Sequence, residues 1–480
     1  MERIIKNYSP DSLFGNFEEI SAIPRGSGNE AQIAAYIEEK ARALGHFCVR
    51  DGANNVFVRI AATKGREKEK AVLLQGHTDM VCEKNSDTEH DFLRDGLKLY
   101  VENGILRARG TTLGADNGIA VAVMLALMEG ECDSHPTLEC LFTTDEEVGL
   151  LGAGSFDYSV VTATKMINMD SEEEGAVVVG CAGGVRSDMS IKCKTQTFRG
   201  EALNISLTGL FGGHSGENIG SGRANAIKLM GRILLALSAK MRVNVLSVSG
   251  GSKDNAIPRE ASATVSVANA ERAAKAVLAE VERIRVELVS EDEGLVVSCS
   301  IADAPEHMLD AQTSRRILGV LGCVQNGVIE MSNSVAGLVG FSRNLGIVRT
   351  DSENGEVVFT FSSRSPLDSQ LDASIASLDA LAALCGGKTR HHSRYPGWSY
   401  AKRSPMREKY IAAAREIFGK EPTVRVLHAG LECGIIKSRL PRLDIISVGP
   451  DMKDIHSPDE QLDLRSCERF WTLICRLLAK

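Results

Sequence analysis

The sequence predicts an α/β protein in which a central mixed sheet flanked by helices is interrupted by an inserted α+β domain with an internal duplication. Apolar, strand-like runs alternate with helical patterns over the first 185 residues. This pattern of strands and helices changes from about residue 186 and returns after residue 393. With 480 residues, the chain also exceeds the size at which one hydrophobic core stops growing. Two domains are therefore expected, and the larger one is discontinuous.

The first part of the larger domain is expected over residues 1–185. A helix over residues 29–44 precedes the strands NVFVRIA and AVLLQGH, and a helix over residues 117–129 precedes the strands LECLFTT and KMINMDS. Apolar strands of this kind, separated by helices, predict a sheet that is covered by helices. Polar residues stand at several strand ends, where open α/β sheets place their ligands.

The inserted domain is expected over residues 186–393. Its first part has the strand NISLTGL, a helix over 224–237, the strands VNVLSVS and SATVSVAN, and a helix over 271–288. A second pass begins near residue 310 with a helix, a hairpin turning at Asn354-Gly355, and a helix over 372–384. Two β/α units with a similar succession of strands and helices indicate a duplication, although residue identity between them is weak.

The chain is expected to return to the larger domain over residues 394–480. The segment CGGKTRHHSRYPGW, residues 385–398, is rich in glycine, basic and turn residues and is interpreted as the linker. After it, a helix over 406–418, the segment TVRVLHAGLECG, the strand DIISVGP and a helix over 468–478 complete the domain.

Composition excludes several classes of partner. The formal net charge is −8 without long single-sign blocks, which argues against nucleic acid and against an anionic membrane surface, since both select basic proteins. The beginning of the chain has no secretory pattern, and the longest apolar run, 119–128, is far shorter than a membrane span. The twelve cysteines include no CxxC pair, as expected for reduced thiols. We therefore expect a cytoplasmic protein.

Possible metal ligands occur in five separate segments, each beside a predicted strand end or a glycine-flanked turn. They are His77 with Asp79 in GHTD, Asp116 in GADNG, Glu146 and Glu147 in TTDEEVG, Asp170 in INMDS, and His456 in DIHSPDE. Side chains at i and i+2 of a strand point the same way, so Asp79 can orient the His77 ring and leave its other nitrogen for a metal. Imidazoles together with carboxylates suit zinc or a similar divalent ion.

Two neighbouring ions are a known solution for hydrolysis, because one activates water and both stabilise the developing oxyanion. A free carboxylate must then act as general base, and the adjacent Glu146 and Glu147 can divide coordination and proton transfer. Each signal alone has an ordinary interpretation: a structural HxD, a DN turn or helix cap, a solvated EE pair and a surface histidine. Their joint occurrence favours a metal centre.

The segments GHTDMV, TLGADNG, TTDEEVGLLGA, INMDSE and DIHSPDE resemble the ordered motifs of the M20 metallopeptidases, which have a zinc-exopeptidase-like catalytic domain. FGGHSGENI, GLECG and the large insertion resemble the bacterial aminoacyl-histidine (Xaa-His) dipeptidase branch. This resemblance runs over essentially the whole chain. It implies a catalytic domain in two parts, 1–185 and 394–480, and a lid and dimerisation domain over 186–393.

The resemblance also implies roles for the ligands. His77 and Asp170 would hold one zinc, Glu147 and His456 the other, and Asp116 would bridge them, with Co²⁺ or Mn²⁺ as possible substitutes. Asp79 would clamp the His77 ring. Glu146 would be the general base, taking a proton from metal-bound water so that the hydroxide attacks the scissile carbonyl. A cis peptide after Asp116 is also implied.

The substrate-binding expectations concern the insert and the returning chain. By its family position, His214 would stabilise the oxyanion, often in the other subunit of a homodimer. Arg364 and Asn255, by theirs, would grip the substrate carboxylate. Each has an ordinary alternative: a flexible loop, an exposed strand-end cation and a turn residue. In HAGLECG, Gly430 would allow close backbone approach to a bound group, and Glu432 would meet a substrate amine. His428 and Glu432 could instead form a buried salt bridge.

These expectations combine into a dinuclear zinc dipeptidase acting on small unblocked dipeptides, including Xaa-His substrates of the carnosine type. A related M20 activity, such as an N-acyl-amino-acid deacylase or a tripeptidase, would use the same metals. A metal-binding scaffold without activity is the alternative from another class, although such a protein would not need the general base Glu146.

Overall fold

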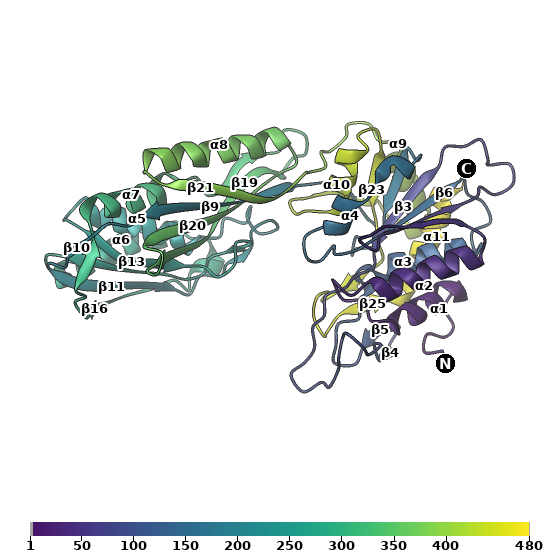
Figure 1. The fold of residues 1–480 in the computed structure, drawn as a ribbon, viewed down its shortest axis with the longest axis horizontal. Coiled ribbons are helices and arrows are strands. Elements are labelled where there is room, and N and C mark those ends of the chain that lie inside the picture. The colour runs from purple at the N-terminus through teal and green to yellow at the C-terminus, as the bar shows by residue number, and fades with distance from the viewer. Residues whose placement is uncertain (1–2, 480) are drawn as a thin grey trace. The chain divides into compact units, whose positions relative to one another are not determined.

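The fold is described from a computed structural model for residues 3–479. The chain forms two compact units (Figure 1). Unit 1 comprises Met1–Cys181, Trp398–Val426 and Leu431–Lys480, and unit 2 comprises Ala182–Gly397 and Leu427–Gly430. The short return of 427–430 to unit 2 was not anticipated, since the whole HAGLECG segment was expected in the larger domain. The backbone N–H of Ala182 explains it, because this group lies 3.0 Å from the carbonyl oxygens of both Leu427 and Ala429.

Unit 1 is built on a mixed sheet with the strand order β1-β2-β6-β3-β7-β23-β8-β22. The strands are β1 (Phe47–Arg50), β2 (Val56–Ile60), β6 (Leu138–Thr143), β3 (Val72–His77), β7 (Lys165–Asn168), β23 (Asp444–Ser447), β8 (Ala176–Cys181) and β22 (Thr423–Leu427). The central strands β6, β3, β7 and β23 run parallel to one another, and β2 and β8 pair with them antiparallel. The carboxyl ends of the parallel strands therefore meet at one edge of the sheet.

Helices cover this sheet. They are α1 (Asp11–Ser21), α2 (Ala31–Ala43), α3 (Ala115–Met128), α4 (Leu151–Ser155), α9 (Pro405–Phe418), α10 (Glu432–Arg439) and α11 (Leu464–Leu478). Helix α3 is apolar on all sides because it packs between β3 and α1, and each of its residues from 117 to 128 is buried. Two strands that precede α3 in the chain, β4 (Leu99–Glu102) and β5 (Ile105–Ala108), belong to a small separate sheet. They are joined there by β24 (Met452–Lys453) and β25 (Gln461–Asp463), in the order β24-β25-β5-β4.

Unit 2 contains an antiparallel sheet with the strand order β16-β11-β15-β13-β19-β20-β9-β21, and β18 (Gly327–Met331) pairs with β19. One half has the chain order β11 (Glu201–Thr208), α5 (Ala226–Ser238), β13 (Asn244–Gly250), β15 (Ala261–Val267), α6 (Ala270–Arg285) and β16 (Val296–Ala302). The other half has β9 (Gly183–Lys192), α7 (Ala311–Cys323), β19 (Val339–Asp351), β20 (Glu356–Ser365), α8 (Asp368–Leu384) and β21 (Lys388–Tyr395).

Each half is a βαββαβ motif whose strands lie in the order fourth, first, third, second, which is the split βαβ arrangement. The halves join edge to edge through the second strand of each, β13 and β19, at Ser249 opposite Arg349 and Gly250 opposite Val348. The duplication is therefore visible in the topology. However, the halves are not in tandem, because the first strand of the second half, β9, precedes the whole first half in the chain.

The segment interpreted as a linker also differs from the expectation. Residues 388–395 form the edge strand β21, which pairs antiparallel with β9. The His391 ring lies 2.9 Å from an Asp379 carboxylate oxygen, and the His392 ring lies 3.3 Å from Asp188. These acidic partners on α8 and β9 hold a basic stretch that has no apolar strand pattern of its own. The sequence signal for a loop was therefore wrong.

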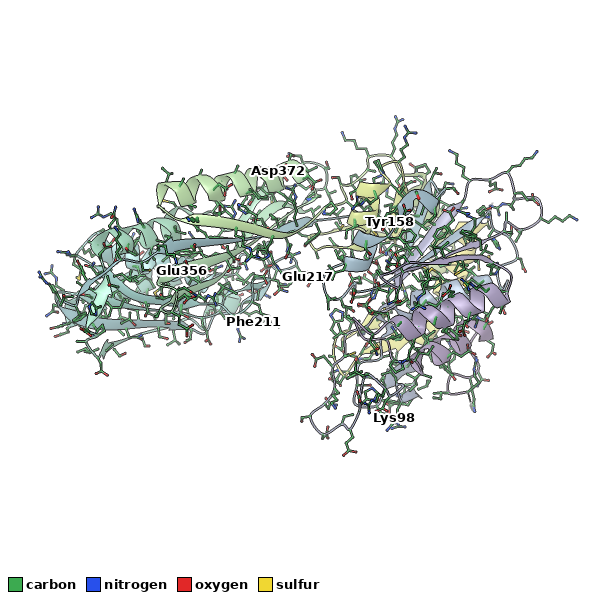
Figure 2. All side chains as sticks on the ribbon, viewed as in Figure 1. Lys98, Tyr158, Phe211, Glu217, Glu356 and Asp372 are labelled. Carbon is green, nitrogen blue, oxygen red and sulfur yellow. The ribbon has the colours of Figure 1, made fainter. Side chains whose placement is uncertain are left out.

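Figure 2 shows the side chains, with Lys98 and Tyr158 labelled in unit 1 and Phe211, Glu217, Glu356 and Asp372 in unit 2. Within residues 3–479, every helix is too short or too polar to cross a lipid bilayer. The cysteines in this range are free thiols, and half of them are buried.

Candidate dinuclear metal centre

The structure brings the five separate ligand segments together at the carboxyl edge of the unit 1 sheet. His77 ends β3, Glu146 and Glu147 follow β6, and Asp170 follows β7. Asp116 lies at the start of α3, and His456 lies in the turn between β24 and β25. Parallel strands aligned in one register explain this convergence, since their connections leave the sheet side by side.

Asp116 lies between the two imidazoles. Its Oδ1 atom is 3.1 Å from Nε2 of His77, and its Oδ2 atom is 3.2 Å from Nε2 of His456. Each imidazole faces one further carboxylate: Asp170 Oδ1 lies 3.3 Å from His77 Nε2, and Glu147 lies 3.1 Å from His456 Nε2. The donor atoms of each resulting triad lie within 4.8 Å of one another. Two adjacent cation positions that share Asp116 fit this arrangement.

Asp79 connects the histidine to the acidic turn after β6. Its Oδ1 atom lies 3.3 Å from His77 Nδ1, and its two carboxylate oxygens accept the backbone N–H groups of Glu146 at 3.1 Å and Glu147 at 3.2 Å. Ser27 donates a further hydrogen bond of 2.8 Å to the same carboxylate. Burial opposes ionisation of Asp79, but the hydrogen bonds and the charge of His77 lower its pKa. A fixed anion thus orients both the ring and the turn.

Glu146 differs from the other carboxylates of the cluster. Among the hydrogen bonds of residues 3–479, none joins it to an imidazole nitrogen. It lies with Glu147 within 4.8 Å of a His77 ring nitrogen. Burial raises the pKa of Glu146 well above its ordinary value, and the neighbouring Asp170, Glu432 and Glu147 add to the rise while His77 opposes it. Such a group has a raised proton affinity, as a general base working near neutral pH needs.

The protonation pattern tests whether divalent cations fit. Despite burial, the surrounding carboxylates raise the pKa of His77 well above its usual value, and hydrogen bonds to Asp116 and Glu147 raise that of His456 to about 10. Burial raises the pKa of Asp170 to about 6. The carboxylates thus outnumber the positive charges and recruit protons onto both imidazoles. Divalent cations would supply that positive charge, and the imidazole and carboxylate donors suit zinc and its neighbours.

The peptide bond between Asp116 and Asn117 is cis, as the resemblance implied. Asn117 was not anticipated as a site residue, yet its side-chain amide donates to the Met169 carbonyl and to Asp170 Oδ1, both at 2.8 Å. Glu30 is a second missed residue, because it accepts the backbone N–H of Asp145 at 3.0 Å. Asn117 belongs to GADNG, and Glu30 ends the glycine-rich segment PRGSGNE, so polar residues inside glycine-flanked turns were the available signal.

Glu432 occupies a different environment from the one expected. Its side chain is fully buried at the start of α10, where Oε2 accepts hydrogen bonds from Gln75 and Thr143 and Oε1 has no partner. Gln75 in turn accepts a 2.7 Å hydrogen bond from Asn168. Burial raises the pKa of Glu432 to about 8. Glu432 therefore belongs to a polar layer beneath the ligand-bearing strand ends, with no surface exposed to a substrate amine.

His214, Arg364 and His428 form a basic cluster within unit 2. His214 lies on β12 (Gly213–His214), which pairs with β14 (Ala256–Ile257). Burial and the positive charge of Arg364 lower the pKa of the His214 imidazole. Burial and the charges of Arg364 and His214 lower the pKa of His428 to about 4. The Nε2 atom of His428 contacts Ser342 Oγ at 2.7 Å, and the ion pairs of residues 3–479 include none between His428 and Glu432.

Arg364 is buried, and its Nε has no hydrogen-bond partner, while Nη1 donates to the Tyr395 hydroxyl at 3.0 Å. Gly430 packs against the same tyrosine, because a Cβ atom at that position would lie 2.8 Å from the ring. Asn255 is exposed, and its backbone carbonyl accepts the N–H of Ser215 at 2.8 Å, which ties its loop to that of His214. The four expected binding residues of unit 2 thus share one region, with Arg364 and His214 at its charged centre.

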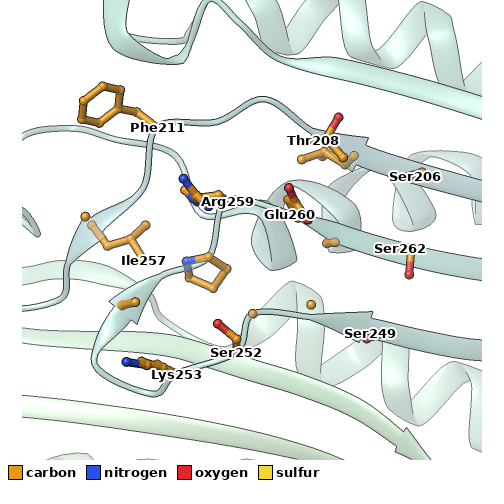
Figure 3. Close-up of a pocket in the computed structure, with 17 residues that line it drawn as sticks. Ser206, Thr208, Phe211, Ser249, Ser252, Lys253, Ile257, Arg259, Glu260 and Ser262 are labelled. Atoms are coloured by element: carbon orange, nitrogen blue, oxygen red, sulfur yellow. The ribbon is translucent and has the colours of Figure 1, made fainter. Parts of the chain in front are cut away.

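A hollow of about 660 Å³ lies on the same unit (Figure 3). Its lining comes from β11, β13, β15 and the segments between them, and it includes serine and glycine residues together with Phe211, Lys253 and Arg259. None of the residues that line it is an expected metal ligand. The hollow adjoins His214 through Gly213, its neighbour on β12, and through Ala256, its partner on β14, but His214, Arg364 and His428 do not line it.

Comparison with known proteins places the chain in a family. The pattern of Peptidase family M20/M25/M40 matches residues 73–480. The chain is 37% identical over 478 residues to the cytosol non-specific dipeptidase of Escherichia coli (strain K12), covering 99% of this chain and 98% of that protein.

Among solved structures, the crystal structure of aminoacylhistidine dipeptidase from Vibrio alginolyticus is similar with a TM-score of 0.92 and 35% identity, covering 98% of this chain and 97% of that one. Aminopeptidase PepT from Bacillus cereus shares the fold with a TM-score of 0.58 at 17% identity, covering 98% of each chain. The expected metal ligands lie within the matched range, and the long alignment leaves no domain of the chain outside it. The chain therefore belongs to peptidase family M20/M25/M40.

Proposed function

We propose that this protein is a cytoplasmic dinuclear zinc dipeptidase that hydrolyses unblocked dipeptides, including Xaa-His substrates of the carnosine type. One observation carries the proposal: the two oxygens of Asp116 face His77 and His456 separately, and each imidazole has a carboxylate partner of its own. The names of the Escherichia coli and Vibrio relatives, a dipeptidase and an aminoacylhistidine dipeptidase, support the substrate class.

His77 and Asp170 would hold one zinc, Glu147 and His456 the other, and Asp116 both, with Co²⁺ or Mn²⁺ as substitutes. When bound, such cations supply Lewis-acid activation of water and of the peptide carbonyl. Glu146 would accept the proton of the attacking water and deliver it to the amine that leaves. Asp79 would hold the His77 ring and the Glu146–Glu147 turn in position, through the contacts described above.

The basic cluster of unit 2 would bind the substrate's C-terminal carboxylate. Arg364 offers a buried guanidinium with an unpaired Nε, and His214 and His428 lie within its electrostatic reach. An anion would satisfy the free donor of Arg364 and offset its positive charge beside the two imidazoles. Asn255 and Gly430 would shape the same region through the backbone. His214 would in addition stabilise the oxyanion, as its family position suggests.

This cluster is assembled from residues of one chain. His214 lies on β12, in the chain between β11 and α5 of the first half, and Arg364 lies on β20 of the second half; the β13–β19 junction joins these halves within the same molecule. We propose that His214 works with Arg364 of its own chain. A homodimer, as expected from the resemblance, would then not be needed to complete the carboxylate site.

A substrate panel tests the proposal. The purified protein, freed of metal and reconstituted with Zn²⁺, Co²⁺ or Mn²⁺, is assayed on carnosine, other Xaa-His dipeptides, dipeptides without histidine, a tripeptide and N-acetyl amino acids. We expect hydrolysis of the dipeptides with two metal equivalents bound. Preference for the tripeptide or the N-acetyl amino acids would replace the proposal by another M20 activity. Full activity in the presence of a strong chelator would refute it.

A further inference from the structure

Glu460 is a buried acid that the proposed chemistry leaves without a role. Only 2% of its surface is exposed. Its Oε2 atom accepts the backbone N–H groups of Leu113 at 2.7 Å and Gly114 at 2.9 Å. Its Oε1 atom accepts those of Ala115 at 2.8 Å and Asp116 at 3.4 Å. One carboxylate thus gathers four consecutive N–H groups at the turn that carries the shared ligand Asp116.

Arg25 holds the same turn from its carbonyl side. Its guanidinium is buried, and it donates to the carbonyl oxygens of Thr78 at 3.0 Å, Asp79 at 3.4 Å and Gly114. A Cβ atom at Gly114 would lie 2.5 Å from Arg25 Nη2, and one at Gly118 would lie 2.7 Å away. The glycines of the turn therefore make room for the guanidinium, which connects the His77–Asp79 segment to the Asp116 turn.

Charge explains why these two residues occur together. An arginine and a glutamate buried singly would each be costly. The charge of Glu460 is the foremost influence that offsets the effect of burial on the pKa of Arg25, followed by that of Asp79. The Glu460 carboxylate also lies at the N-terminus of α3, where the positive end of the peptide dipoles stabilises a negative charge. Burial raises the pKa of Glu460, and its hydrogen bonds from the N–H groups of Leu113, Gly114 and Asp116 oppose that rise.

We propose that Glu460 is a positioning residue that sets the orientation of Asp116 between the two cation positions, while Arg25 holds the same turn through its carbonyl groups. The inference rests on the proposed metal-dependent function. Glu460 also belongs to the β24–β25 turn that carries His456, so one short segment supplies a ligand and fixes the ligand that this histidine faces. Displacing the 113–116 backbone would move Asp116 relative to both imidazoles and weaken cation binding at both positions.

Glu460→Gln is the sharpest variant. Both oxygens of Glu460 accept N–H groups, and an amide would turn its NH₂ group toward two of these donors while keeping the volume of the side chain. Asp459→Asn is the matched control, because it removes one negative charge from the adjacent, exposed residue. The readout is Co²⁺ binding by the metal-free full-length proteins, measured by calorimetry and by the visible absorption of the bound cobalt.

We expect the wild type and Asp459→Asn to bind two equivalents with the same affinity and spectrum. Glu460→Gln should bind cobalt about 10- to 100-fold more weakly, the range found when partners of metal ligands are removed, with an altered spectrum. Folding of each variant is checked by circular dichroism. A folded Glu460→Gln protein that binds two Co²⁺ ions with wild-type affinity and spectrum would overturn the inference.

If Glu460→Gln does not fold, amide hydrogen exchange in the metal-free wild type decides the question. The inference requires strong protection of the 113–116 amides before any metal is added, and rapid exchange there would refute it. These measurements use no substrate. A wild type that binds two cobalt ions but cleaves no dipeptide would remove the proposed function and leave the role of Glu460 standing or falling on its own data.

Discussion

The Oδ1 atom of Asp79 lies 3.3 Å from Nδ1 of His77, so that the other ring nitrogen of this histidine faces Asp116 and Asp170. The same carboxylate holds the backbone of the Glu146–Glu147 turn. One fixed anion therefore sets the direction of a proposed ligand and the position of the proposed general base.

Replacing Asp79 by asparagine should weaken metal binding. The amide keeps the size of the side chain but loses the charge that favours the His77 orientation, and it cannot accept both turn N–H groups through two oxygens. We expect zinc affinity to fall by about 10- to 100-fold, measured by competition with a chromophoric chelator. Wild-type affinity in this variant would show that the carboxylate does not support the ligand.

Glu146→Gln should separate catalysis from metal binding. Removing a general base costs about 10²- to 10⁴-fold in rate, whereas Glu146 accepts no bond from an imidazole and its loss should leave both cations bound. We expect kcat to fall in that range with little change in KM and with two zinc equivalents per chain by elemental analysis. A variant that retains wild-type kcat would move the general base elsewhere.

The buried acid Glu432 predicts a pH-dependent stability. Its pKa is about 8 in the folded protein, above the ordinary value of 4.5, so the folded state binds more protons than the unfolded state between these values. The free energy of unfolding should therefore fall as pH rises from about 5 to 8, by at most about 1.4 kcal/mol per pH unit from this group.

The measurement is urea unfolding of the metal-free protein at several pH values, compared with Glu432→Gln. Because glutamine does not titrate, the variant should gain stability relative to the wild type as pH increases. A constant difference between the two proteins across this range would mean that Glu432 is not protonated in the native state.

Arg364 should discriminate substrates by their C-terminal charge. A hydrogen bond to a charged group contributes about 1.5 to 3 kcal/mol, so Arg364→Ala should lower kcat/KM for a free dipeptide by about 10- to 100-fold. A dipeptide with an amidated C-terminus should be affected far less. Arg390→Ala, which removes an exposed cation of β21 in the same unit, is the control and should behave like the wild type.

Mixing two inactive variants tests whether the basic cluster is formed within one chain. His214→Ala and Arg364→Ala chains are co-expressed with different tags, and the hybrid is purified through both tags where subunits associate. If His214 serves its own chain, no hybrid contains an intact cluster and activity stays at the level of the single variants. Recovery toward half of the wild-type activity would instead place His214 beside the Arg364 of a partner.

The sequence by itself indicated helices α2, α3, α9 and α11, strands β2, β3, β6, β7 and β23 of unit 1, and the segments that carry the proposed metal ligands. Runs such as AVLLQGH and LECLFTT are apolar over the length of a buried strand, and polar residues follow at their ends. Helix α3 was recognisable because ten successive apolar residues, 119–128, require burial on all sides. These are local patterns, and local patterns are what periodicity and burial make readable.

Only the tertiary structure decided which residues support the ligands and how the insert is wired. The β21 strand has no strand pattern and exists because β9 and α8 offer it partners, and the first strand of the second half of unit 2 lies far before its other strands. Glu432, Arg25 and Glu460 were not identifiable in these roles, because a buried charge is indistinguishable from a solvated one until its partners are in place. The hydrogen bonds between residues 113–116 and Glu460 join segments that are far apart in the chain. The local sequence around either segment therefore gives no sign of them.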